Sequence, residues 1–168
     1  MIDAEPGPAT QTVEKLIRLH NLLFLVVVVN ALASYPIVKI TGIFNNPPAR
    51  MIWLNVGCIV LPIVSLIFTA LATDRMIRAL VRRRGDVETT ADDSAACFKR
   101  SKMISIVLMT LCGLFAGTCV ILGHRVREAI LAVIPVLLML LTRPSGMSLT
   151  NFVKLVEMER MEQFPAES

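Results

Sequence analysis

Residues 51–73 form a run of 23 residues without a charged side chain. As an α-helix rising about 1.5 Å per residue, this run would be roughly 34 Å long, more than the hydrocarbon core of a bilayer at about 30 Å. The run therefore predicts a transmembrane helix. Three further apolar stretches, at residues 21–38, 103–123 and 126–142, predict that the chain crosses the membrane several times.

The composition agrees with an integral membrane protein. Of the 168 residues, 55% are hydrophobic and 18% are charged, whereas soluble domains carry about 25% charged residues. No small-residue cleavage site follows the first apolar run, which favours a retained signal anchor over a signal peptide. We expect an all-α fold in which a flexible cytoplasmic tail (residues 1–12) precedes a four-helix transmembrane domain (13–146), with helices at about 13–44, 50–84, 98–123 and 126–142 and a cytoplasmic loop at 85–97.

The connections predict two tight antiparallel hairpins. Asn45 to Pro48 form a strong helix breaker that leaves few residues before the second helix. Residues 123–127 leave equally little room between the third helix and the fourth. The fourth segment has 17 residues, roughly 26 Å, and contains Pro135. A re-entrant segment is the alternative, but irregular backbone at that depth must be buried in protein, so spanning is the preferred interpretation.

The distribution of positive charge predicts the orientation. One side of the membrane receives 13 Lys and Arg residues, which are Lys15 and Arg18, eight within residues 74–102, and Arg143, Lys154 and Arg160. The opposite side receives four, which are Lys39, Arg50, Arg125 and Arg127. The positive-inside rule then places both termini in the cytoplasm, with the chain in an inner or plasma membrane. Anionic lipid headgroups near Arg82, Arg83 and Arg84 are expected partners. The net charge of +4 therefore requires no nucleic-acid partner.

Residues 147–168 predict one more helix, which is amphipathic and cytoplasmic. Leu149, Phe152, Val153 and Val156 fall at i, i+3, i+4 and i+7 and form an apolar stripe. The segment carries four Glu against one Lys and one Arg, whereas helices on membrane surfaces are usually rich in Lys and Arg. The stripe is therefore expected to dock on a protein partner, and a frayed tail is the alternative, since short helices are marginal alone.

The third predicted helix carries a band of small residues. Gly113 and Gly117 form a GxxxG pair, and the band also contains Cys112, Ala116, Cys119 and Gly123. Small residues let helix backbones approach closely, and this gains dispersion energy where lipid provides no hydrophobic drive. The band predicts helix packing, either within this chain or against another subunit.

Polar residues within the predicted spans are few. Asn30 and Ser34 share one face of the first helix, and Asn55 lies in the outer part of the second. No ionisable side chain lies near a predicted midplane, which lowers the expectation of an ion-coupled carrier. Hydrogen bonds between helices are the favoured role of these three residues, over a substrate site.

The sequence predicts no catalytic, cofactor or metal residues. His20 and His124 lie on opposite sides of the membrane, so they cannot both ligate one haem. A single His with a Met could still act as a ligand pair, although Met in an apolar helix usually packs. The four cysteines form no CxxC, and the nucleophile, zinc and P-loop motifs are missing from the sequence.

Two functional hypotheses follow. The first is a non-catalytic accessory or scaffolding subunit of a larger membrane complex, whose partners are other membrane-protein subunits. The second is a small channel or transporter that acts as a homo-oligomer, with Asn30, Asn55 and the prolines of the spans near a pathway. An integral-membrane enzyme is a third hypothesis of lower weight.

Overall fold

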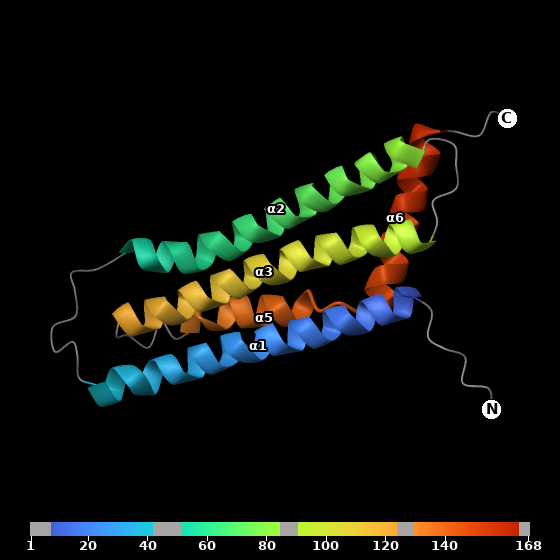
Figure 1. The fold of residues 1–168 in the computed structure, drawn as a ribbon. Coiled ribbons are helices and arrows are strands. Elements are labelled where there is room, and N and C mark those ends of the chain that lie inside the picture. The colour runs from blue at the N-terminus through green and yellow to red at the C-terminus, as the bar shows by residue number, and fades with distance from the viewer. Residues whose placement is uncertain (1–7, 42–51, 85–90, 124–129, 165–168) are drawn as a thin grey trace, which may run out of the picture. The chain divides into compact units, whose positions relative to one another are not determined.

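The computed structural model of the chain describes residues 8–41, 52–84, 91–123 and 130–164, and all regular structure in these ranges is helical (Figure 1). Three long helices come first: α1 (Pro8–Thr41), α2 (Ile52–Arg84) and α3 (Ala91–Gly123). Two shorter helices follow, α5 (Val133–Leu141) and α6 (Gly146–Gln163). The prediction of an all-α fold is confirmed.

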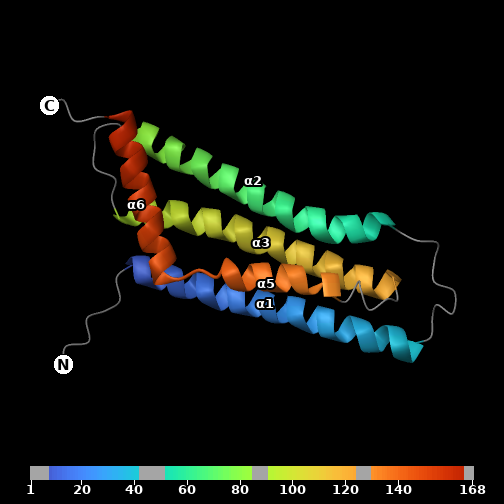
Figure 2. The same ribbon diagram turned by 180° about the vertical axis from the view of Figure 1, so that it is seen from behind.

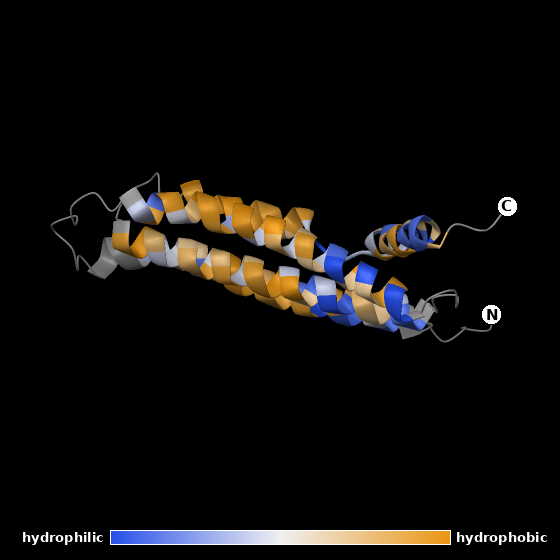
Figure 3. Ribbon diagram, turned by 90° about the horizontal axis from the view of Figure 1, so that it is seen from above, coloured by the Kyte–Doolittle hydropathy of each residue, from blue (hydrophilic) through white to orange (hydrophobic). Residues whose placement is uncertain are grey.

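Three helices, α1, α2 and α3, are long and apolar enough to cross a membrane. A fourth span is present if α5 and α6 are counted together as one broken span. Hydrophobic residues cover most of the length of the long helices (Figure 3). The chain is thus compatible with a multi-pass membrane protein. Both predicted hairpin turns fall on residues 42–51 and 124–129, outside the described residues.

The described helices divide into two units. Unit 1 comprises Met1–Leu19, Phe68–Ile104 and Pro144–Ser168, and unit 2 comprises His20–Ile67 and Ser105–Arg143. In unit 1, both ribbon views show α6 lying across the ends of α1, α2 and α3 (Figures 1 and 2). In unit 2, α5 packs with α1 and α3.

Helix α3 is the central helix of unit 2. In the most apolar 18-residue stretch of α3, 56% is buried, whereas 17% is buried in the corresponding stretches of α1 and α2. One core cluster joins Met109 of α3 to Val27 of α1 and Met139 of α5. A second cluster joins Ala116 and Cys119 of α3 to Cys58 of α2. The core of the unit is therefore organised around α3, while α1 and α2 leave broad apolar surfaces uncovered.

Helix α3 begins at Ala91 and not near Phe98, so the predicted loop at residues 85–97 is helical over its second half. Its first turn carries Asp92 and Asp93, whose charges are favourable at a helix N-terminus. Ser94 and Ala95 are buried in unit 1. An acidic, small and polar segment was expected to stay irregular, but dipole complementarity and tertiary burial make it helical.

The first and fourth predicted helices also differ from the structure. Helix α1 begins at Pro8, five residues earlier than predicted, and proline suits a first helical turn because its missing N–H would have no partner there. The segment predicted as one helix over 126–142 is broken at Ala132. Pro135 accounts for the break, because it cannot donate to the carbonyl of Leu131 and its ring crowds that carbonyl. Helix α5 alone, with nine residues, is about 13 Å long and cannot cross a bilayer.

Candidate functional site

The small-residue band of α3 packs against α1 of the same chain. A Cβ atom added at Gly113 would lie 2.8 Å from Cγ2 of Val27, and one added at Gly117 would lie 2.7 Å from Cγ of Asn30. Cys112, Ala116 and Cys119 are buried in the same unit. The small-residue band therefore packs against another helix of the same chain, which is the first of the two interpretations of this band. Gly123 ends α3, and no contact of it is described.

Asn30 and Ser34 both make side-chain hydrogen bonds, one between helices and one within α1. The Asn30 side-chain amide donates from Nδ2 to the carbonyl oxygen of Leu114 in α3, at 3.4 Å. The Ser34 hydroxyl donates to the carbonyl oxygen of Asn30, one turn earlier in α1. Hydrogen bonds of this kind between membrane helices contribute about 0.6 kcal/mol each on average. Asn30 therefore makes a hydrogen bond between helices, whereas the Ser34 bond stays within α1.

Asn55 is different, because its buried Oδ1 atom has no hydrogen-bond partner among the described residues. Elsewhere in unit 2, the hydroxyl of Ser65 in α2 lies 3.3 Å from Sγ of Cys112 in α3. In unit 1, the hydroxyls of Thr73 and Ser101 lie 2.6 Å apart and join α2 to α3. Polar groups along the α2–α3 contact thus mostly pair with each other, and Asn55 is an exception.

His20 joins α1 to the end of α5. Its side chain is 2% exposed, and Nε2 lies 2.9 Å from the carbonyl oxygen of Met139. Met139 is in the last turn of α5, where carbonyls lack partners within the helix. A ring N–H donating there satisfies one of them. The sequence could not reveal this contact, because it joins residues 119 positions apart.

The apolar stripe of α6 lies against the chain itself. Phe152 and Val156 are buried, and the Phe152 ring meets Phe98 of α3 edge to face, with the ring centroids 5.6 Å apart. Leu149 and Val153 on the same stripe are partly buried. The sequence predicts that this stripe docks on a partner; in the structure Phe152 and Val156 are buried within unit 1. Phe98 was already expected on a helix, but helical periodicity does not show that α6 lies against it.

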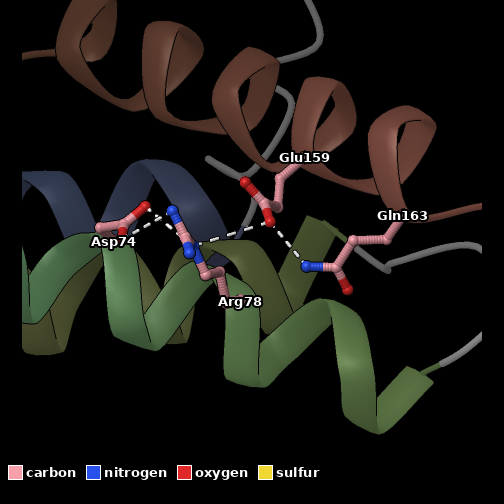
Figure 4. A network of polar contacts seen from close by, with 4 residues as sticks. All are labelled: Asp74, Arg78, Glu159 and Gln163. Atoms are coloured by element: carbon pink, nitrogen blue, oxygen red, sulfur yellow. Dashed lines mark hydrogen bonds and ion pairs between the residues drawn. The ribbon is translucent and has the colours of Figure 1, made fainter.

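Polar contacts orient α6 on α2. Arg78 of α2 pairs with Asp74 one turn earlier, at 3.2 Å, and lies 3.8 Å from a carboxylate oxygen of Glu159 in α6 (Figure 4). Gln163 donates to that same Glu159 oxygen at 2.6 Å. At its start, α6 is closed by a capping box between Ser145 and Ser148. Because Arg78 is about half exposed, the ion pairs add little stability and mainly set the helix orientation.

The outer face of α6 is unexpectedly apolar. Four apolar side chains on it are each more than half exposed: Met147, Leu155, Met158 and Met161. Met147 and Met158 are three turns apart, and Leu155 and Met161 lie three residues either side of Met158, so the four share the side opposite Phe152. We call these four residues the methionine face. The sequence pattern identifies the buried stripe, and the structure adds that the methionine face on the other side of α6 is exposed.

The exposed surfaces of unit 2 suit contact with lipid. Helix α2 alone exposes many large apolar side chains, from Val56 to Ile67. Trp53, near the start of α2, is 85% exposed, and Trp is enriched where membrane meets water. At the other end of α2, in unit 1, Arg82 and Arg83 are exposed. The side chain of Arg84 lies outside the described part of the chain.

Among the described residues, no group of three His, Cys, Asp or Glu side chains is placed to hold a metal ion. The four cysteines are buried thiols. No protein-family model, no curated protein and no solved structure matches this chain.

Proposed function

We propose that the chain is a non-catalytic accessory or scaffolding subunit of a larger membrane complex, and that the methionine face of α6 is its contact with a neighbouring subunit. The supporting observation is the exposure of Met147, Leu155, Met158 and Met161 on one side of a helix whose other side is already buried. Methionine side chains are flexible and polarizable, and they recur on surfaces that bind other proteins.

The charges around the methionine face indicate the kind of partner. Lys154 and Glu162 are exposed among its four residues, each four positions from Met158, and Glu157 is exposed at its edge. A net negative rim disfavours adsorption to anionic lipid. It favours a protein surface that presents apolar side chains within a basic rim.

The packing of unit 2 supports a structural role as well. Asn30, Ser65 and His20 each make contacts that join one helix to another. These groups hold helices in place. The broad apolar surfaces of α1 and α2 are available to lipid or to other spans.

Asn55 supports the second candidate, a channel or transporter built as a homo-oligomer. Its buried and unpartnered Oδ1 is the kind of group that can face a polar pathway. Pro62 lies inside α2 two turns further on, and proline-interrupted helices form the sites of many transporters.

Purification in mild detergent distinguishes the two candidates. We expect the tagged full-length chain to recover a defined set of other subunits at fixed stoichiometry, measured by quantitative mass spectrometry. Met158→Asp should reduce that recovery about tenfold, since a charge would be placed in an apolar contact worth about 1.4 kcal/mol or more.

Lys15→Gln is the matched control, because it changes the net charge by the same amount at an exposed position of α1 and leaves the methionine face intact. Recovery with this variant should stay within twofold of the unmodified chain. A clean homo-oligomer would favour the channel, and a monomer without partners would exclude both candidates. Equal loss from both substitutions would show that charge, and not the methionine face, governs association.

We further propose that both termini are cytoplasmic, as the distribution of Lys and Arg predicts. A cysteine introduced at Asn46 should react with a membrane-impermeant maleimide on intact cells, whereas one at Thr89 should react only after the cells are opened. The four native cysteines are buried, so background labelling should be low. Reaction of the Thr89 variant on intact cells would reverse the orientation.

A further inference from the structure

Unit 1 contains a cavity of about 330 Å³ between the end of α2 and the start of α3. Helix α2 contributes Met76, Leu80 and Arg83 to its lining, and α3 contributes Asp93, Cys97 and Arg100. The volume lies within the range of pockets that bind small ligands. The lining combines an apolar wall with two guanidinium groups, an arrangement suited to an amphiphile.

The two arginines are available to an anion. Within the described part of the chain, the ion pairs of α2 are those of Arg78 with Asp74 and Glu159, and none involves Arg83 or Arg100. Both side chains are exposed. Asp93 is the carboxylate in the lining, so the charged residues that line the cavity sum to +1.

The cavity begins at the level of the headgroup layer of a membrane. The hydroxyls of Thr73 and Ser101, 2.6 Å apart, mark one level on both helices. Thr73 ends the charge-free run of α2, and Ser101 lies two residues before that of α3. Met76 is three residues beyond this level and Arg83 is ten, or about 4.5 and 15 Å. The headgroup layer is about 5–7 Å thick on each side of the hydrocarbon core, so the cavity starts in this layer and extends toward water.

The ordinary tilt of helical side chains directs Arg83 and Arg100 toward each other along the helix axes, from the two ends of the cavity. Side chains on an α-helix tilt toward its N-terminus. Helices α2 and α3 are antiparallel in unit 1 (Figures 1 and 2). Arg83 therefore leans back toward the end of the charge-free run, and Arg100 leans away from it. A phosphate held between them could receive two donors from each planar fork.

We propose that this cavity binds the phosphate of one anionic phospholipid, with Arg83 and Arg100 as donors and with Met76 next to the glycerol end of its acyl chains. The apolar wall favours a lipid over free phosphate, because Met76 lies three residues from the charge-free run. This site is separate from the methionine face. Binding at this site differs from a general attraction between headgroups and Arg82, Arg83 and Arg84, because Arg82 does not line the cavity.

The test uses the full-length chain in nanodiscs of phosphatidylcholine with about one tenth phosphatidylglycerol. Native mass spectrometry after release would count the phosphatidylglycerol molecules that stay bound. We expect one retained molecule per chain, and a loss of about tenfold in retention in the double variant Arg83→Gln, Arg100→Gln. Arg82→Gln removes the same charge from the same run outside the cavity and should change retention less than twofold.

A second variant keeps the test decisive if the double variant folds poorly. Asp93→Asn removes the carboxylate of the lining and should raise retention, whereas weaker retention would contradict the proposal. Equal loss in Arg82→Gln and the double variant would mean unspecific attraction and would overturn it. Binding of inorganic phosphate without retention of phosphatidylglycerol would overturn the lipid assignment. Partner recovery through the methionine face is measured separately, so failure of either proposal is distinguishable from failure of the other.

Discussion

Gly113→Leu should prevent most of the chain from reaching its folded state in the membrane. The closest neighbour of Gly113 is Val27, which is fully buried in α1. Because valine is stiff about χ1, its methyl groups cannot rotate away from a new side chain. Overpacking of this kind costs about 3 kcal/mol. The measurement is the yield of monodisperse protein in mild detergent and its resistance to unfolding by added denaturing detergent.

Two further variants serve as comparisons for Gly113→Leu. Gly117→Leu should be less damaging, since its nearest atoms belong to the amide end of Asn30, which can move at the cost of its bond to Leu114. Thr118→Leu adds bulk at an exposed position on the same helix and should leave the yield unchanged. Equal yields from all three variants would show that close packing of α1 on α3 does not limit folding.

Phe152→Ala should release α6 while the long helices stay inserted. Phe152 and Phe98 are both buried, and they meet edge to face. Removal of a buried Phe side chain costs about 3–5 kcal/mol, which a short helix with half-exposed ion pairs cannot offset. The expected result is faster trypsin cleavage after Lys154 and Arg160 in membranes, with no loss of inserted protein.

Met158→Ala is the control for this experiment, because it truncates an exposed side chain on the opposite face of α6. Its cleavage rate should match that of the unmodified chain. If Phe152→Ala also leaves cleavage unchanged, then Val156 and the Glu159 contacts hold α6 without the aromatic pair. Disappearance of the protein from the membrane would mean that α6 is needed for insertion.

The sequence by itself determined where the long helices run. The second helix was expected over residues 50–84 and is found at Ile52–Arg84, because a charge-free run has one stable backbone form in lipid and that form depends only on local hydrogen bonds. The small-residue band on α3 and the packing role of Asn30 were also predictable. Both follow from spacing along a single helix.

Only the tertiary structure decided what each helix face contacts. The sequence pattern identifies the stripe of α6 that contains Phe152, and only the structure shows that this stripe packs against Phe98 of the same chain. The same applies to His20, whose partner carbonyl is 119 residues away, and to Arg83 and Arg100, which reach one cavity from two helices. Helix formation depends on neighbours along the chain. The contacts of α6, of His20 and within the cavity depend instead on residues that are distant in sequence. Hydrophobic periodicity along one segment does not predict such contacts.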